Sequence, residues 1–222
     1  MHTQWIVIDG APSSGKTTVV HALQRRGLRI IPEVARAFAE MELARGKPLE
    51  EVRGNPRAFQ GAVIDLFVER ERRLSPEETL VLDVGLPGCS AYVRLHKLEG
   101  LPDPLAAHTH RYQHVFLFDR LPFEEDHVRT ENEAMAIFLD RAIEDAYRRL
   151  GYSPTRVPVM DVEERAEFVL TSLHLAQQSP PPQHSSGLSR SDSAPCCNSH
   201  APGSWNECPL RTRTSPQAAH SP

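Results

Sequence analysis

The chain has 222 residues, of which 24% are charged and 40% hydrophobic, and its formal net charge at pH 7 is −4. This length allows one sizeable core. The acidic balance argues against a general surface for nucleic acid or anionic membranes, and no apolar run approaches the length of a membrane span. We therefore expect a protein with no nucleic-acid partner and no membrane span.

The composition of the chain changes near residue 176. From Ala176 onward the sequence is dominated by Ser, Pro, His and Gln, with almost no aliphatic periodicity. Such a segment cannot bury enough apolar surface to offset the entropy lost on ordering it. We predict a folded nucleotide-binding domain over residues 1–175 and a disordered Ser/Pro-rich tail over residues 176–222.

Cysteine use indicates a reducing compartment. Only Cys89 lies in the predicted core, whereas Cys196, Cys197 and Cys208 lie in the tail. The core therefore has no disulfide framework. The first residues, MHTQW, lead directly into an apolar run with no signal peptide before it. From these features we expect a cytoplasmic protein.

Along residues 1 to 175, apolar runs of strand length alternate with helical segments. The connections are long enough for right-handed crossovers, so the pattern predicts an α/β fold with a five-stranded parallel sheet flanked by helices. Ligands of such sheets bind beyond the carboxyl ends of the strands. The expected strands are 5–9, 29–32, 79–84, 114–118 and 155–159. The expected helices are one that ends at residue 26, four over 33–45, 57–74, 89–97 and 132–150, and one that begins at 161.

The stretch IVIDGAPSSGKTTVV, residues 6 to 20, contains the spacing G-x-x-x-x-G-K-[ST] of a Walker A phosphate-binding loop, or P-loop. The expected strand precedes it and the expected helix follows it, as the motif requires. A chance match in an ordinary glycine turn is the alternative, and the agreement of strand, spacing and helix argues against it. The predicted nucleotide-binding residues are Gly10, Ala11, Pro12, Ser13, Ser14, Gly15, Lys16, Thr17 and Thr18.

Each part of this loop has a physical task. Gly10 and Gly15 permit backbone conformations that a Cβ would block, so that successive N–H groups can turn toward a polyphosphate. The helix that follows points its positive end at the same place. Lys16 would reach the β- and γ-phosphates, and the Thr17 hydroxyl would ligate Mg²⁺. The loop therefore predicts binding of Mg²⁺ with ATP or GTP.

Two acids follow expected strands. Asp83, in TLVLDVG, lies where an acid that holds Mg²⁺ together with Thr17 is expected; the alternative is an aspartate that caps the next turn. Glu33, in LRIIPEVAR, could take a proton from a substrate hydroxyl as general base. Its alternative is an acid placed at a helix N-terminus because the helix dipole favours it there.

The segment LPFEEDHVRTENEA, after the fourth expected strand, is polar and poorly periodic, as a loop that closes over phosphates would be. Arg129 could neutralise charge on the transferring phosphoryl group. The alternative is a solvated arginine paired with Glu131 or Glu133. Arg36 and Arg120 are weaker candidates of the same kind.

Several motifs occur in order along residues 4 to 173: GAPSSGKTT, IIPEVAR, AFQ, VLDVGLPGCSAY, VFLFDRLPFEEDHVRTE, YRRLGY and VPVMDVEER. In this series the chain resembles the small AAA-domain family of P-loop ATPase/kinase-like proteins, which includes relatives of the translocation-defect nucleotide-binding proteins and resembles the ribosylnicotinamide kinase domain of NadR. The resemblance implies a P-loop NTPase of kinase-like fold that binds Mg-nucleotide. It also matches Gly10 to Thr18 with the nucleotide loop, Glu33 and Arg36 with the acid and arginine after the second strand, Asp83 with the acid of a D-R-G motif, and Asp126, Arg129 and Glu131 with a D-x-x-R-x-E lid.

The chain departs from the family pattern at two positions. Val84 stands where the family usually has arginine, and Gly88 where it often has aspartate. If those side chains hold the second substrate, catalysis here is weakened or altered, whereas nucleotide binding survives.

Two functions are compatible with these features. The first is an Mg-ATP-dependent phosphotransferase with an unidentified small hydroxyl-bearing acceptor and with Lys16, Glu33, Asp83 and Arg129 as catalytic residues. The second is a nucleotide-switched binding protein with slow hydrolysis of ATP or GTP and a protein partner, which the absence of arginine at position 84 favours. A remodelling motor is excluded because Asp83 is followed by Val84 rather than by a second acid. A GTPase is disfavoured because no N-K-x-D motif occurs. We expect the enzyme.

Overall fold

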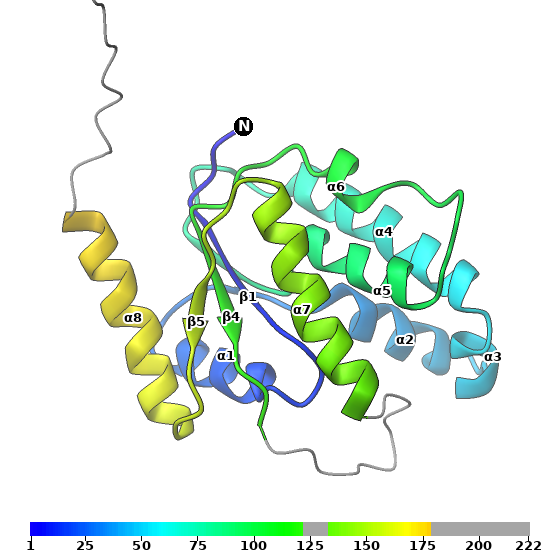
Figure 1. Ribbon diagram of the computed structural model, residues 1–222, viewed down its shortest axis with the longest axis horizontal. Helices are drawn as coiled ribbons and strands as arrows, with labels where there is room; N and C mark the ends of the chain where they lie inside the picture. Colours follow the sequence, from blue (N-terminus) through cyan, green and yellow to red (C-terminus); the bar gives the residue numbers. More distant parts are fainter. Residues whose placement is uncertain (122–132, 179–222) are drawn as a thin grey trace, which may run out of the picture. The chain divides into compact units, whose positions relative to one another are not determined.

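The computed structural model describes residues 1–121 and 133–178, within a compact unit that runs from Met1 to Pro180. Five parallel strands form one sheet in the order β2-β3-β1-β4-β5, with helices on both faces (Figure 1). The strands are β1 (Trp5–Asp9), β2 (Ile30–Ile31), β3 (Leu80–Asp83), β4 (His114–Phe118) and β5 (Thr155–Val157). The helices are α1 (Lys16–Arg25), α2 (Val34–Ala44), α3 (Leu49–Arg53), α4 (Pro56–Arg73), the 3₁₀ turn η1 (Leu86–Gly88), α5 (Cys89–Leu95), α6 (Pro104–Ala107), α7 (Glu133–Arg149) and α8 (Val162–Gln178).

The first strand is the centre of the sheet. β1 pairs with β3 on one side, where Ile8 lies opposite Asp83, and with β4 on the other, where Asp9 lies opposite Leu117. All five residues of β1 are buried, which is why the sequence there is a continuous apolar run rather than an alternating one. Because the strands are parallel, their carboxyl ends meet at one edge, and the residues after β1, β2 and β3 lie together there.

Successive side chains of β1 point to opposite faces of the sheet and enter two cores. Ile6 and Ile8 pack with residues of α1 and α8. Trp5 and Val7 pack with residues of α5 and α7. Figure 1 shows the same division, with α1 and α8 on one side of the sheet and α2, α4, α5 and α7 on the other. A third cluster joins α2, α3, α4 and α5 around Phe59 and Phe67.

The predicted elements agree with the observed ones most closely at the centre of the sheet. β1 and β4 have the predicted bounds, whereas the predicted strand over 29–32 is reduced to the two residues of β2, which pairs with β3 alone. The helix predicted over 33–45 ends at Ala44, and Gly46, with φ 88°, follows in the left-handed conformation common after helices. The short elements α3, η1 and α6 were not predicted, because three to five residues are too few to display a helical period.

Helix α8 runs to Gln178, three residues into the predicted tail. The predicted division between domain and tail stays a prediction, because residues 179–222 lie outside the described residues. No helix among residues 1–121 and 133–178 combines the length and the apolarity that crossing a membrane requires.

Candidate active site

The predicted phosphate-binding loop connects β1 to α1 at the carboxyl edge of the sheet. Its backbone is left-handed at Ser13 (φ 67°) and at Gly15 (φ 76°). A Cβ on Gly10 would lie 2.9 Å from the carbonyl oxygen of Phe118, so the loop can pass this close to β4 only with glycine there. The strained conformation of Ser13 is of the kind that occurs at ligand sites. The loop thus has the strand, the turn and the helix that the motif requires.

Lys16 is the first residue of α1, and its side chain folds back across the loop. Its Nζ donates hydrogen bonds to the carbonyl oxygens of Gly10 (2.7 Å) and Ala11 (3.0 Å) and to the Ser14 hydroxyl (3.3 Å). The ammonium group is therefore held over the concave side of the loop by three oxygen atoms. Phosphate oxygens are acceptors of the same kind and could take the place of these contacts.

Asp83 ends β3, directly beside the strand that enters the loop. The backbone N–H of Val84 donates to the carbonyl of Ile8 (2.9 Å), which fixes the two strand ends together. Asp83 is only 5% exposed, and its Oδ1 has no hydrogen-bond partner among the described residues. Burial, followed by the nearby charge of Glu33, raises the pKa of Asp83 to about 6, whereas Lys16 acts in the opposite direction.

These residues fit a magnesium ion. Mg²⁺ prefers oxygen ligands and is usually held by one or two protein groups together with substrate phosphates and water. The unpartnered Oδ1 of Asp83 is an oxygen of this type, and the Thr17 hydroxyl in the first turn of α1 is another. Within residues 1–121 and 133–178, no group of three or more His, Cys, Asp or Glu side chains could hold a metal by itself. A metal here would therefore depend on the nucleotide for the rest of its ligands.

Glu33 precedes α2 as its N-cap residue, but its side chain makes no capping hydrogen bond. Glu33 and Arg36 both line the cavity that contains the loop. Among the described residues, neither side chain has a hydrogen bond or an ion pair. The carboxylate of Glu33 is therefore available to a bound molecule, which the capping role of a helix acid would have prevented.

The cavity has a volume of about 570 Å³ and extends from the loop to the helices of one face. One end is formed by the loop and the start of α1. The other end is formed by α2, α3, α4 and α5, with Val84 and Gly88 between the two ends. A volume of this size is typical for a small-molecule site. The lining residues of the second end are Ala35, Arg36, Ala39, Glu40, Leu43, Leu49, Arg53, Phe59, Gln60, Val63, Phe67, Cys89 and Tyr92.

Asp9 explains the glycine at position 88. Its carboxylate accepts hydrogen bonds from the Tyr147 hydroxyl (2.6 Å) and from the N–H of Gly10 (2.7 Å). A Cβ on Gly88 would lie 2.5 Å from Asp9 Oδ2, so an aspartate at position 88 would collide with this carboxylate. Burial raises the pKa of Asp9, and the charge of Lys16 and the hydroxyl of Tyr147 act against that rise. The buried carboxylate of Asp9 therefore explains why position 88 has glycine where the family often has aspartate.

Val84 has φ 67°, a left-handed conformation that a β-branched residue rarely adopts. Its carbonyl oxygen accepts a hydrogen bond from Arg70 Nη2 (3.4 Å), and Arg70 Nη1 donates to the carbonyl of Pro32 (2.8 Å). One guanidinium from α4 therefore joins the segments that follow β2 and β3. A strained backbone at this edge is of the kind found next to functional groups.

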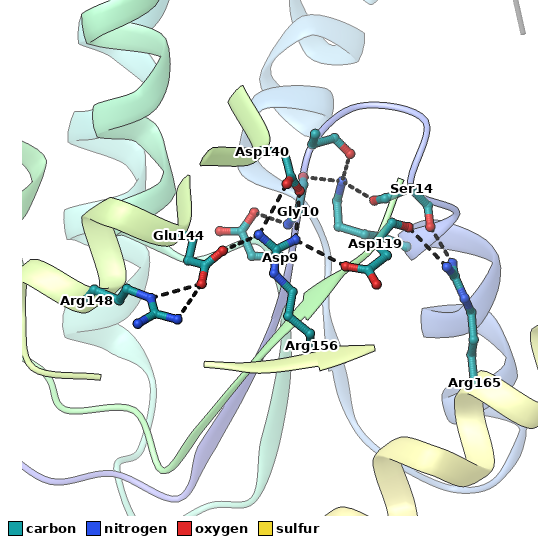
Figure 2. Close-up of polar contacts among 11 residues, drawn as sticks. Asp9, Gly10, Ser14, Asp119, Asp140, Glu144, Arg148, Arg156 and Arg165 are labelled. Carbon is teal, nitrogen blue, oxygen red and sulfur yellow. Dashed lines mark hydrogen bonds and ion pairs between the residues drawn. The ribbon is translucent and has the colours of Figure 1, made fainter. Parts of the chain in front are cut away.

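Arg165, on α8, holds three loops together and was not singled out in the sequence. It is 2% exposed, and its guanidinium donates to the carbonyl oxygens of Ser14 (2.6 Å), Asp119 (3.0 Å) and Pro158 (2.8 Å). Figure 2 shows its side chain directed toward Ser14. Because each of these carbonyls belongs to a different loop at the carboxyl edge, Arg165 fixes the phosphate-binding loop against the segments after β4 and β5.

Arg156, on β5, makes a second set of contacts nearby. It pairs with Asp140 (2.9 Å) and Glu144 of α7 and with Asp119 (3.3 Å), which follows β4 (Figure 2). Hydrogen bonds to Asp140 and Glu144 raise its pKa against the effect of burial. This network joins the last two strands to α7 beside the loop.

Not every predicted site residue can be placed. Arg129, together with Asp126 and Glu131, lies outside the described residues, and its predicted role stays a prediction. Arg120 lies 3.6 Å from Glu133 at the end of the described segment after β4. The structure brings Glu33 and the predicted loop residues other than Ala11, whose side chain is buried in the core, to one cavity, and it places Asp83 beside that cavity.

The family model for the AAA domain matches residues 5–165, which cover the whole sheet and the loop described above. The chain belongs to the AAA-domain family. No curated protein matches it at a significant level.

Solved structures share the fold of this AAA domain. NadR, in complex with NR, superposes with a TM-score of 0.57 at 16% identity and covers 80% of this chain and 52% of its own. A thymidylate kinase from Ehrlichia chaffeensis has a TM-score of 0.56 at 13% identity over 78% of this chain and 100% of its own. A deoxyadenosine kinase from M. mycoides, with dCMP and dCDP bound, has a TM-score of 0.53 at 13% identity over 77% of this chain and 99% of its own. The chain therefore has the kinase-like P-loop fold, and it spans about half the length of NadR.

Proposed function

We propose that this AAA domain is a phosphotransferase that moves the γ-phosphoryl group of Mg-ATP to the hydroxyl group of a small molecule. The observation that carries the proposal is the two-ended cavity. Its first end is the phosphate-binding loop, its second end is enclosed by α2 to α5, and Glu33 lines it between them. A protein that only binds and hydrolyses a nucleotide needs the first end alone.

The loop would bind the nucleotide phosphates. The three oxygen atoms that now hold Lys16 Nζ would be exchanged for oxygens of the β- and γ-phosphates. Thr17 and Asp83 would hold Mg²⁺, which supplies positive charge to the β- and γ-phosphate oxygens when it is bound. The positive end of α1 and Lys16 would stabilise the charge that develops on the transferring group.

At the second end, Glu33 would act on the acceptor. The acceptor hydroxyl oxygen forms the new bond to the γ-phosphorus, the bond between that phosphorus and the oxygen of ADP breaks, and the hydroxyl proton passes to the Glu33 carboxylate. The products are a phosphate monoester and ADP. The absence of any hydrogen bond or ion pair to Glu33 among the described residues supports this role, because a proton acceptor must be free to reach its substrate.

The names of the structural neighbours agree with this reaction class. Two are called kinases, of deoxyadenosine and thymidylate, and the third is described in complex with NR. At 13 to 16% identity they show the fold alone, and the substrate of this chain has to be argued from its own cavity.

A second candidate function is a nucleotide-dependent switch that hydrolyses ATP or GTP slowly and is recognised by a protein partner. Val84 favours it, since the family usually has arginine there. Against it stands the enclosed second end of the cavity, which a switch would not need.

The purified full chain with Mg-ATP tests the proposal, with ADP formation measured in the presence and absence of a panel of hydroxyl-bearing small molecules. We expect at least one of them to increase the rate of ADP formation by an order of magnitude or more. If ADP forms slowly and no compound changes the rate, the phosphotransferase is rejected in favour of the nucleotide-dependent switch. Glu33→Gln should remove the stimulation and leave nucleotide binding intact.

A further inference from the structure

Arg70, on α4, contacts the backbone beside both acids of the proposed reaction. Its Nη1 donates a hydrogen bond of 2.8 Å to the carbonyl of Pro32, which directly precedes Glu33. Its Nη2 donates a longer hydrogen bond, of 3.4 Å, to the carbonyl of Val84, which directly follows Asp83. Because a guanidinium is planar and rigid, its two donors hold these two carbonyls at a fixed separation.

The sheet holds Asp83 more firmly than it holds Glu33. Asp83 lies opposite Ile8 in the ladder between β3 and β1, and the N–H of Val84 donates to the Ile8 carbonyl (2.9 Å). β2, in contrast, ends at Ile31, two residues before Glu33, and pairs with β3 alone. The residue between them is a proline, which has no N–H with which to continue the ladder. The guanidinium from α4 therefore connects a segment beyond the end of the ladder to a strand end that the sheet already holds.

The side chain of Arg70 is itself held by its own helix. Its Cζ lies 4.5 Å from the centroid of the Phe67 ring, a stacking contact that suits a guanidinium. Phe67 lines the cavity, and Arg70 is not among the described residues that line it. Arg70 therefore supports the wall of the cavity, and it can influence a bound molecule only through the residues that it holds.

A role in charge pairing does not account for this arginine. In the part of the chain that the structure describes, Arg70 forms no ion pair, and the carboxylate of Glu71 accepts a hydrogen bond from the Tyr112 hydroxyl (2.6 Å) instead. The Nε of Arg70 is buried and has no partner among the same residues, which is unfavourable. A lysine would reach one carbonyl without burying that group. The guanidinium is explained by its reach to two carbonyls at once.

We infer that Arg70 is a positioning residue, which holds the proton acceptor Glu33 at a fixed distance from Asp83. This inference rests on the proposed function, and it adds to that function a residue that touches neither substrate. Phosphoryl transfer depends on the positions of the reacting groups, and misplacing one of them by about 1 Å lowers the rate by about a hundredfold. The contacts of Arg70 lie outside the phosphate-binding loop. We therefore expect Arg70 to affect kcat and not the KM for ATP.

The test uses the full chain and Mg-ATP with a panel of hydroxyl compounds, namely nucleosides, monosaccharides and polyols. With the compound that stimulates ADP formation most, Arg70→Met should lower kcat by about ten- to a hundredfold and change the KM for ATP by less than about threefold. Arg70→Lys keeps the charge and one donor for the Pro32 carbonyl, so we expect a fall in kcat of about three- to tenfold. Arg73→Met, at an exposed arginine of α4 that pairs with Glu69, is the matched control and should change neither constant.

A double substitution separates positioning from a general loss of structure. In Glu33→Gln, the group that Arg70 positions is no longer a proton acceptor, so Arg70→Met should lower the remaining rate of ADP formation by less than about threefold. An equal fall in both backgrounds would mean that Arg70 supports the fold alone, and would overturn the inference. A KM for ATP that rises as kcat falls would do the same. If Arg70→Met does not fold, Arg70→Lys decides the question, since a wild-type kcat in that variant would show that the two carbonyls need not be joined.

These outcomes differ from a failure of the proposed function. If no compound stimulates the wild-type chain, the phosphotransferase and the inference are both rejected. If a compound stimulates it and the variants of Arg70 behave like Arg73→Met, the inference alone is rejected.

Discussion

The two ends of the cavity differ in how their polar groups are satisfied. At the nucleotide end, Lys16 has three oxygen partners and Arg165 has three carbonyl partners, all from the protein itself. At the proposed acceptor end, Glu33 has no hydrogen bond or ion pair among the described residues, and Asp83, beside the loop, has an unpartnered oxygen. The protein itself satisfies the polar groups of the first end, whereas Glu33 and Asp83 keep oxygen atoms that a bound molecule could contact.

Because of this difference, substitutions at the two ends should affect stability and activity in different ways. Removing a side chain at the nucleotide end should lower both stability and nucleotide binding, because Lys16 and Arg165 hold the loop that would bind the phosphates. Removing a polar group at the acceptor end should lower activity and leave stability unchanged or improved. The predictions below test this separation.

The largest effect is expected at Lys16. Lys16→Ala removes the charge that faces the phosphates and leaves the carbonyls of Gly10 and Ala11 without their donor. We expect ADP formation to fall by a factor of about a hundred to a thousand and tight nucleotide binding to be lost, measured by titration with a fluorescent ATP analogue. Lys47→Ala, which removes an exposed lysine paired with Glu42, is the control. Unchanged nucleotide affinity in Lys16→Ala would contradict the whole account of the site.

At Asp83 the two effects should have opposite signs. Asp83→Asn should lower activity about a hundredfold and raise the free energy of unfolding of the ligand-free protein at pH 8 by up to about 3 kcal/mol, since the pKa of Asp83 is raised to about 6 in the folded state and charging it there is unfavourable. Chemical denaturation with and without nucleotide measures both. Asp65→Asn, at an exposed position of α4, should change neither.

The contribution of Asp83 to stability depends on pH, and its direction follows from the raised pKa. A raised pKa means that the folded state holds the proton more tightly than the unfolded state, so this residue adds stability as the pH falls from above 6 toward 4. Over the same range kcat/KM for Mg-ATP should decrease, because protonated Asp83 is a poor metal ligand. Wild-type and Asp83→Asn stability curves that run parallel between pH 4 and 7 would show that burial of this acid is not costly.

A smaller loss of activity is expected at Arg165. Arg165→Met leaves three carbonyl oxygens without their donor, and we expect a loss of about 3 kcal/mol in the free energy of unfolding and a KM for ATP about tenfold higher, since Ser14 is no longer fixed. Arg25→Met, an exposed arginine that pairs with Glu163, is the matched control. If Arg165→Met loses stability while its KM for ATP is unchanged, the contact supports folding alone.

The smallest effect is expected at Tyr147. Tyr147→Phe removes the 2.6 Å hydrogen bond to Asp9 and keeps the ring in its core. We expect a loss of about 1 kcal/mol in stability and less than a tenfold change in kcat/KM, measured by thermal denaturation and by steady-state rates. An effect as large as that of Lys16→Ala would indicate that Asp9 takes part in the reaction rather than only supporting the loop.

Sequence reasoning was most successful where the determining interactions are local. The bounds of β1 and β4 were predicted because strands buried on both faces are continuous apolar runs. The phosphate-binding loop was predicted because its motif lies within eight residues. The position of Glu33 directly after β2 was enough to predict that it lies near the site, since parallel strands bring their carboxyl ends to one edge. Glu33 lines the cavity.

The residues that were missed depend on distant partners. Arg165 donates to a carbonyl 151 residues away, and nothing in its own helix distinguishes it from an exposed arginine. Asp9 receives a hydrogen bond from a residue 138 positions away. These two residues could be identified only from the arrangement of the elements in space.

The contact between Arg165 and Ser14 also sets the order in which the protein becomes competent during synthesis. The phosphate-binding loop leaves the ribosome before α8, which carries the arginine that fixes it. Domains generally fold as units once their sequence is complete. A chain that ends before residue 165 would therefore carry the whole Walker A motif and still lack the arginine that holds the loop in place.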